Sequence, residues 1–182
     1  MRTEHSIATP IGAILITAES NGEISLASGD LPRSIANGMT IDRSIACVLT
    51  VQPRADATDI RFNANLIGLS VDGSPSTGEC LDCLEWETEE WQLSVGTEDQ
   101  EMLARRLPEL CIQVDPYPIE YTTSGLSLVL CQMPLRKATT FQFIVNYKGL
   151  PDERKCSAWY FADVSHEVAN KAVNPSGGSG GF

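Results

Sequence analysis

The chain has 182 residues, of which 42% are hydrophobic and 20% charged, and its formal net charge is −11 at pH 7. This length predicts one domain that can bury a core without disulfides or a structural metal. The excess negative charge repels nucleic acid and anionic membranes, so neither is an expected partner. We expect a single domain over residues 1–174, followed by a flexible Gly/Ser tail over residues 175–182.

The N-terminal segment lacks the apolar stretch of a signal peptide, and the apolar run over residues 11–16 is too short to cross a bilayer. We therefore expect a cytoplasmic protein in which the six cysteines are reduced thiols. The even number of cysteines supports the alternative, an exported protein with disulfide bonds.

The first third of the chain predicts strands. Residues 11–29 predict a hairpin in which Asn21 and Gly22 form a type I′ turn, because both residue types tolerate positive φ. Residues 43–52 and 60–71 predict two further strands, since both are rich in β-branched and apolar side chains.

The middle of the chain is interrupted by turn-forming residues. Residues 72–79 contain Gly, Ser and Pro and predict a loop. Residues 85–95 predict a strand in one or two pieces, with Trp86 and Trp91 on opposite faces. That change of face indicates a bulge or a break near residues 89–90.

One short helix is predicted near residues 98–107. Thr97 is the expected N-cap, and Gln100 would complete a capping box with it. Pro108 would end the helix. The expected buried stripe consists of Met102, Leu103 and Leu107.

The C-terminal third predicts the centre of the core. Residues 111–114 and 125–133 predict strands, and residues 139–149 and 156–164 predict a hairpin. Alternation along residues 139–149 places Phe141, Phe143, Val145 and Tyr147 on one face of that hairpin.

We expect Phe143, Val145 and Trp159 to be buried there, because aromatic side chains contribute much apolar area. Residues 167–173 predict either an edge strand or a single helical turn.

In total the pattern comprises eight or nine short strands and one helix, without alternation of strands and helices. This is typical of an all-β fold, and we expect a β-sandwich with Greek-key-like connections.

Negative charge is concentrated in one interval, between Arg61 and Arg105, which contains no Lys or Arg. Its acidic residues are Asp72, Glu79, Asp82, Glu85, Glu87, Glu89, Glu90, Glu98, Asp99 and Glu101. We expect an acidic, solvated face that engages a basic protein surface, since complementary fields accelerate and orient association. The expected partner-binding residues are Glu85, Glu87, Glu89 and Glu90.

This charge pattern indicates a non-catalytic interaction or assembly protein. It could be a structural subunit that assembles into an oligomer, or an inhibitor-type or immunity-type module. The alternative is a metal-binding β-sandwich, with calcium in the acidic loops or zinc on Cys80 and Cys83. These two cysteines form a single Cys-x-x-Cys pair, whereas structural zinc usually takes two close pairs of ligands.

Catalytic motifs do not accompany the candidate residues. His166 lies near Asp163 and Ser165 in sequence, but the Gly-x-Ser-x-Gly turn of a serine hydrolase does not occur. Phosphate-binding and dinucleotide-binding glycine patterns are also missing from the sequence. We therefore expect neither enzymatic activity nor a cofactor.

The state of the cysteines separates the cytoplasmic and exported alternatives. A thiol titration of the denatured, unreduced protein should find all six cysteines free. Two or more missing thiols would favour the exported, disulfide-bonded protein.

Overall fold

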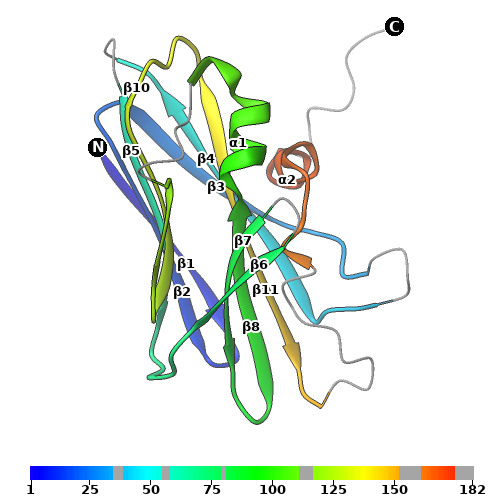
Figure 1. The fold of residues 1–182 in the computed structure, drawn as a ribbon. Coiled ribbons are helices and arrows are strands. Elements are labelled where there is room, and N and C mark those ends of the chain that lie inside the picture. The colour runs from blue at the N-terminus through cyan, green and yellow to red at the C-terminus, as the bar shows by residue number, and fades with distance from the viewer. Residues whose placement is uncertain (35–38, 55–57, 79–80, 111–116, 152–160, 175–182) are drawn as a thin grey trace, which may run out of the picture.

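Two antiparallel sheets form the fold (Figure 1). The computed structural model describes all residues except 35–38, 55–57, 79–80, 111–116, 152–160 and 175–182. In spatial order, the five-stranded sheet contains β1 (Arg2–Thr9), β2 (Gly12–Ser20), β5 (Thr58–Ile67), β10 (Gly125–Met133) and β9 (Ile119–Thr122). The six-stranded sheet contains β3 (Glu23–Asp30), β4 (Arg43–Gln52), β11 (Thr139–Gly149), β8 (Trp91–Glu98), β7 (Leu81–Glu87) and β6 (Ser74–Gly78).

The predicted all-β sandwich is confirmed, with more strands than expected. Eleven strands lie within the described residues, where eight or nine were predicted. The same residues form two α-helices, α1 (Gln100–Arg106) and α2 (His166–Val173), and a short 3-10 helix η1 (Pro108–Leu110) follows α1. No helix of the described chain combines the length and the apolar composition needed to span a membrane.

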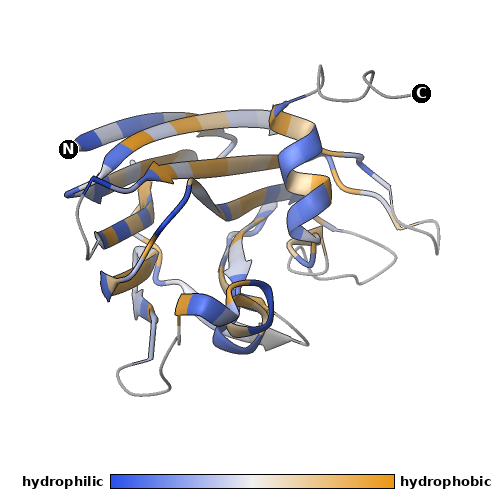
Figure 2. Cartoon of the chain, turned by 90° about the horizontal axis from the view of Figure 1, so that it is seen from above, coloured by the Kyte–Doolittle hydropathy of each residue, from blue (hydrophilic) through white to orange (hydrophobic). Residues whose placement is uncertain are grey.

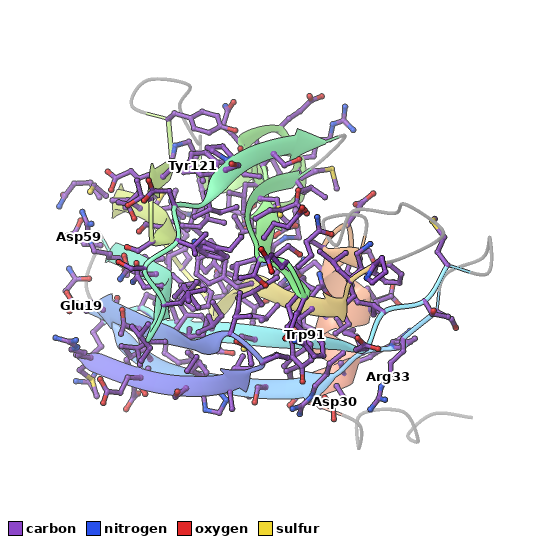
Figure 3. The ribbon with its side chains drawn as sticks, turned by 90° about the horizontal axis from the view of Figure 1, so that it is seen from below. Glu19, Asp30, Arg33, Asp59, Trp91 and Tyr121 are labelled. Atoms are coloured by element: carbon purple, nitrogen blue, oxygen red, sulfur yellow. The ribbon has the colours of Figure 1, made fainter. Side chains whose placement is uncertain are left out.

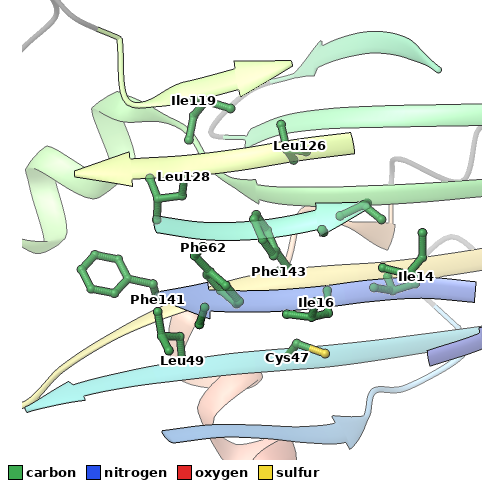
Figure 4. Packing of buried hydrophobic residues seen from close by; sticks show 14 of the residues in the cluster. Ile14, Ile16, Cys47, Leu49, Phe62, Ile119, Leu126, Leu128, Phe141 and Phe143 are labelled. Atoms are coloured by element: carbon green, nitrogen blue, oxygen red, sulfur yellow. The ribbon is translucent and has the colours of Figure 1, made fainter. Parts of the chain in front are cut away.

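The core lies between the sheets because the strands alternate in polarity. Figure 2 shows hydrophobic and hydrophilic residues alternating along the strands. Phe62 of β5 and Phe143 of β11 stack across the interface with ring centroids 4.2 Å apart. Leu49, Leu126 and other fully buried side chains surround this pair (Figure 4).

Strand β11 has the predicted faces but not the predicted partner. Phe143 and Val145 are fully buried in the core, as expected. The neighbours of β11 are β4 and β8, however, and residues 161–164 are not in a strand. The hairpin prediction is therefore wrong for these residues, because strands from elsewhere in the chain occupy the edges of β11. Residues 152–160, which include Trp159, lie outside the described residues.

The segment around Asn21 and Gly22 connects the two sheets instead of forming a hairpin turn. Strand β2 pairs with β1 and β5, whereas β3 pairs with β4. Gly12 and Gly68 are the described glycines with positive φ, so Gly22 is not in a type I′ turn. The prediction fails because β1, which the sequence did not indicate, occupies the position beside β2.

Between residues 72 and 91, one prediction is wrong and one is confirmed. The predicted loop contains the edge strand β6, where Pro75 is tolerated because an edge strand leaves one side without ladder bonds. The break predicted near residues 89–90 is confirmed, and it is a tight turn that pairs β7 with β8. Trp86 and Leu93 thereby face each other and both enter the core.

Helix α1 begins two residues later than its predicted start. Its N-cap is Asp99, whose Oδ1 accepts a hydrogen bond of 2.7 Å from the Met102 amide. Thr97, the predicted N-cap, is a buried residue of β8 that donates to the Gln142 carbonyl. Sheet pairing therefore extends further than the capping pattern indicated.

Residues 166–173 form α2, a two-turn helix, where an edge strand or single turn was predicted. Ser165 is the N-cap and accepts from the Val168 amide. The helix lies beside the outer face of the six-stranded sheet (Figure 1). Ala162 and Ala169 are buried there against Ile144 of β11.

A buried carboxylate connects the two sheets at one corner of the sandwich. Asp82 of β7 accepts hydrogen bonds from the hydroxyl groups of Tyr117 and Tyr121. Tyr121 belongs to β9 in the opposite sheet (Figure 3). Burial and the Asp82 charge raise the pKa of both phenols, which therefore remain protonated donors.

The stacked pair provides a test of the core. Phe143→Ala should lower the free energy of unfolding by about 3–5 kcal/mol, through lost transfer energy and the cavity that remains. Phe143→Leu, which retains most of the volume, should cost clearly less. Denaturant unfolding of both variants measures this. If both variants lost equally little unfolding free energy, Phe143 would not be at the centre of the core.

Candidate functional site

The structure divides the acidic residues between Arg61 and Arg105 into two groups. The first group is engaged within the fold. Besides Asp82 and the helix cap Asp99, it contains Glu98, paired with Arg106, and Glu101, paired with Arg105. The described acids of the second group are at the surface or half-buried: Asp72, Glu85, Glu87, Glu89 and Glu90.

Most of the second group gathers at one end of the six-stranded sheet. Glu87 is the last residue of β7, and the exposed Glu89 and Glu90 lie in the turn before β8. The exposed Asp42 joins them, since its Oδ2 accepts a 2.7 Å hydrogen bond from Gly149, whose neighbour Leu150 donates to the Glu90 carbonyl. We call the carboxylates of Asp42, Glu87, Glu89 and Glu90 the acidic tip.

An aromatic pair lies beside the acidic tip. Trp91 and Tyr147 meet edge to face, with ring centroids 6.2 Å apart. Figure 3 views this end of the sandwich from below, with Trp91 labelled. Trp91 is half-buried, so part of its ring remains accessible next to the carboxylates. Carboxylates next to an aromatic ring suit a Lys or Arg side chain.

Among the described residues, two basic side chains lie near the acidic tip. Arg43 is paired with Asp30 at 3.1 Å, and the Tyr147 hydroxyl and Asp30 raise the pKa of its guanidinium. Lys148 is buried in the row that also contains Gln92 and Glu87, where Gln92 donates to Glu87 at 3.0 Å. One lysine does not balance the carboxylates of the tip, so the described residues at this end carry excess negative charge.

The four predicted partner-binding residues are not all equivalent in the structure. Glu87, Glu89 and Glu90 are exposed, whereas Glu85 is half-buried further along β7. The predicted alternation along one strand ends at Glu87, because the chain turns there. Asp42 was missed, and local sequence could not have indicated it, since the sheet brings it to residues nearly fifty positions away.

Of the two predicted zinc ligands, the structure describes Cys83, and its surroundings do not favour metal binding. Cys83 is fully buried on the outer face of β7, and burial raises the pKa of its thiol, which disfavours the thiolate that zinc requires. Cys80 lies outside the described residues. Across the described chain, His, Cys, Asp and Glu side chains form no group of three or more that could hold a metal ion.

A second polar cluster surrounds His166 at the first turn of α2. Its Nδ1 is 3.0 Å from Gln142 Oε1, and its Nε2 is 2.6 Å from the Thr140 hydroxyl. Gln142 donates through Nε2 to the Val164 carbonyl at 2.8 Å, which fixes the orientation of the amide. His166 therefore donates from Nδ1 and accepts at Nε2, which is the neutral tautomer.

Charge near His166 also favours the neutral ring. Glu98 Oε2 lies 3.9 Å from Nδ1, but Arg106 binds both oxygens of this carboxylate and neutralises it. Burial, and secondly the Arg106 charge, lower the pKa of His166 to about 4. A hydroxyl, an imidazole and a carboxylate in sequence resemble a hydrolytic triad, but a base this weak would activate Thr140 poorly.

Asp163 and Ser165 were the residues considered with His166 in the sequence. Both line a cavity of 410 Å3 together with His166, Glu98 and Arg106. Ser165 caps α2, and the partner of His166 Nε2 is Thr140 of β11 instead. These contacts indicate that the cluster holds α2 in place.

The chain was also compared with known proteins. Neither the family models, nor the curated proteins, nor the solved structures contain a match to it.

Two neighbouring arginines test the buried ion pair. Arg106→Ala should destabilise the fold by about 3–5 kcal/mol, because Glu98, with a side chain only 7% exposed, loses its partner. Arg105→Ala is the matched control, since its partner Glu101 is 69% exposed and the pair contributes less than ~1 kcal/mol. Equal losses in urea unfolding would contradict this difference.

Proposed function

We propose that this protein is a non-catalytic interaction module whose acidic tip binds a basic surface of a partner protein. The observation that carries the proposal is the local excess of carboxylates. Glu87, Glu89, Glu90 and Asp42 form no ion pair within the described part of the chain, although they lie at one end of one sheet. Mutual repulsion of these charges costs stability, and a cationic partner would offset it.

The position of Trp91 supports a cationic protein as the partner. A half-exposed indole next to carboxylates provides both a surface for a Lys or Arg side chain and the charge to orient it. Aromatic residues also contribute strongly to protein interfaces. The proposed partner therefore presents Lys or Arg side chains to the turn between β7 and β8.

The same charge argues against self-association through the tip, because two copies of it would repel one another. If the protein is a subunit of an assembly, the acidic tip would contact a basic surface of a different chain. This favours an inhibitor-type or immunity-type module, or a subunit of a mixed assembly, acting in the cytoplasm.

The test uses a lysine-rich peptide as a defined cationic probe. Replacing Glu87, Glu89 and Glu90 by Gln should slow association with this peptide by roughly ten-fold at low salt. The slope of the rate with ionic strength should also become shallower, because fewer charges steer the encounter. Stopped-flow fluorescence of Trp91 and the other tryptophans follows the binding.

The matched control removes three charges elsewhere. Glu4→Gln, Glu109→Gln and Glu120→Gln together change the net charge equally but affect exposed sites on other elements. This control should bind nearly as fast as the parent protein. Equal slowing in both triple variants would mean that only the overall charge matters, and the acidic tip would lose its proposed role.

A further inference from the structure

Small side chains attach α2 to the outer face of the six-stranded sheet. Ala169 is fully buried there, and Ala172 and Val173 are half-buried. The helix approaches β3 so closely that a Cβ atom at Gly29 would lie 2.1 Å from the Ala172 carbonyl oxygen. Alanine buries little apolar area, and a helix of eight residues is unstable by itself. The polar contacts of its first turn must therefore contribute to the attachment.

His166 makes those contacts, and it makes them as a neutral ring. Nδ1 donates to Gln142, and Nε2 accepts the proton of the Thr140 hydroxyl. A proton added to Nε2 would reverse the second contact, so that the ring donates and the Thr140 hydroxyl accepts, and the ring would carry a positive charge. The side chain of His166 is only 12% exposed, so water solvates this charge poorly.

Two charged side chains, from α1 and β8, lie near His166. Arg106 of α1 opposes a positive ring, whereas the nearby Glu98 of β8 is neutralised by its bidentate pairing with Arg106. The other described polar and charged residues that line its cavity are Arg105, Asp163 and Ser165. Strand β11 contributes the uncharged Thr140 and Gln142.

We propose that protonation of His166 at acidic pH detaches α2 from the outer face of the six-stranded sheet. Detachment would uncover the apolar residues Ala46, Val48 and Ile144, and so would create a new surface at low pH. This device is independent of the acidic tip, which lies on other elements of the fold.

The direction of the pH dependence follows from the two states of the ring. In the attached state the pKa of His166 is lowered from 6.5 to about 4, whereas a detached ring returns to its ordinary value. The attachment is therefore fully stable above pH 6.5 and weakens as the pH falls towards 4. With these pKa values the equilibrium at pH 5 shifts about 30-fold towards detachment.

Hydrogen–deuterium exchange of the α2 amides, corrected for intrinsic exchange rates, measures the attachment directly. Between pH 7.5 and 5.0, protection of residues 166–173 in the parent protein should fall roughly 30-fold relative to the amides of β2 and β5. His166→Asn retains a donor for Gln142 but cannot be protonated in this range, so its protection should stay constant. His5→Asn removes the other histidine and should behave like the parent protein.

A fall in protection that persists in His166→Asn would overturn the proposal, as would an equal loss in β2 and β5, which would report global unfolding. If His166→Asn does not fold, NMR titration of the His5→Asn protein tests whether protonation of His166 is coupled to detachment of α2. The remaining imidazole signal should titrate near pH 4 with the attached state, and the α2 amide signals should shift along with it. A ring titrating near 6.5 without change in α2 would disprove the coupling.

Discussion

Strand β11 is buried on both faces, and the rest of the structure depends on this constraint. Its inner face carries Phe141, Phe143 and Val145 into the core, while Ile144 on the outer face is also fully buried. A sheet with apolar residues on both faces needs a cover on each side. The five-stranded sheet covers one face, and the segment of Ala162 with α2 covers the other. The C-terminal part of the chain is therefore part of the fold.

Close approach makes that second cover possible. A Cβ atom at Gly96 would lie 2.6 Å from the Ala162 methyl group, and the same geometry recurs between Gly29 and α2. Contacts this short bring a chain without large apolar side chains into the van der Waals range of the sheet. The hydrogen bonds of His166 and Gln142 then fix the orientation of α2 on the sheet, because hydrogen bonds are directional and contacts between small apolar side chains are not.

The acidic residues illustrate how burial assigns different roles to one residue type. Asp82 joins the two sheets through two phenols, and Glu98 joins β8 to α1 through Arg106. Buried carboxylates of this kind are tolerated only with donors around them. The carboxylates of the acidic tip have no cationic partner in the described chain, and their residues are exposed to solvent. The buried acids therefore hold the fold together, whereas a role in binding other molecules is what we propose for the tip.

The sequence by itself determined the fold class, the two faces of β11 and the position of α1. Alternation with period two and an amphipathic run are local properties of the sequence. They predict a strand or a helix whichever elements it later packs against. The clustering of acidic residues was visible for the same reason, although it did not distinguish buried from exposed carboxylates.

Only the tertiary structure decided which strands pair and which residues meet. Asn21 and Gly22 favour a hairpin locally, yet β2 gains two other neighbours and the segment crosses between sheets. The register of β4 and β11 brings Asp42 to the acidic tip, and the outer face of β11 selects a helix over residues 166–173. Long-range pairing and burial supply more free energy than a turn dipeptide, and they are not encoded in any single stretch of the chain.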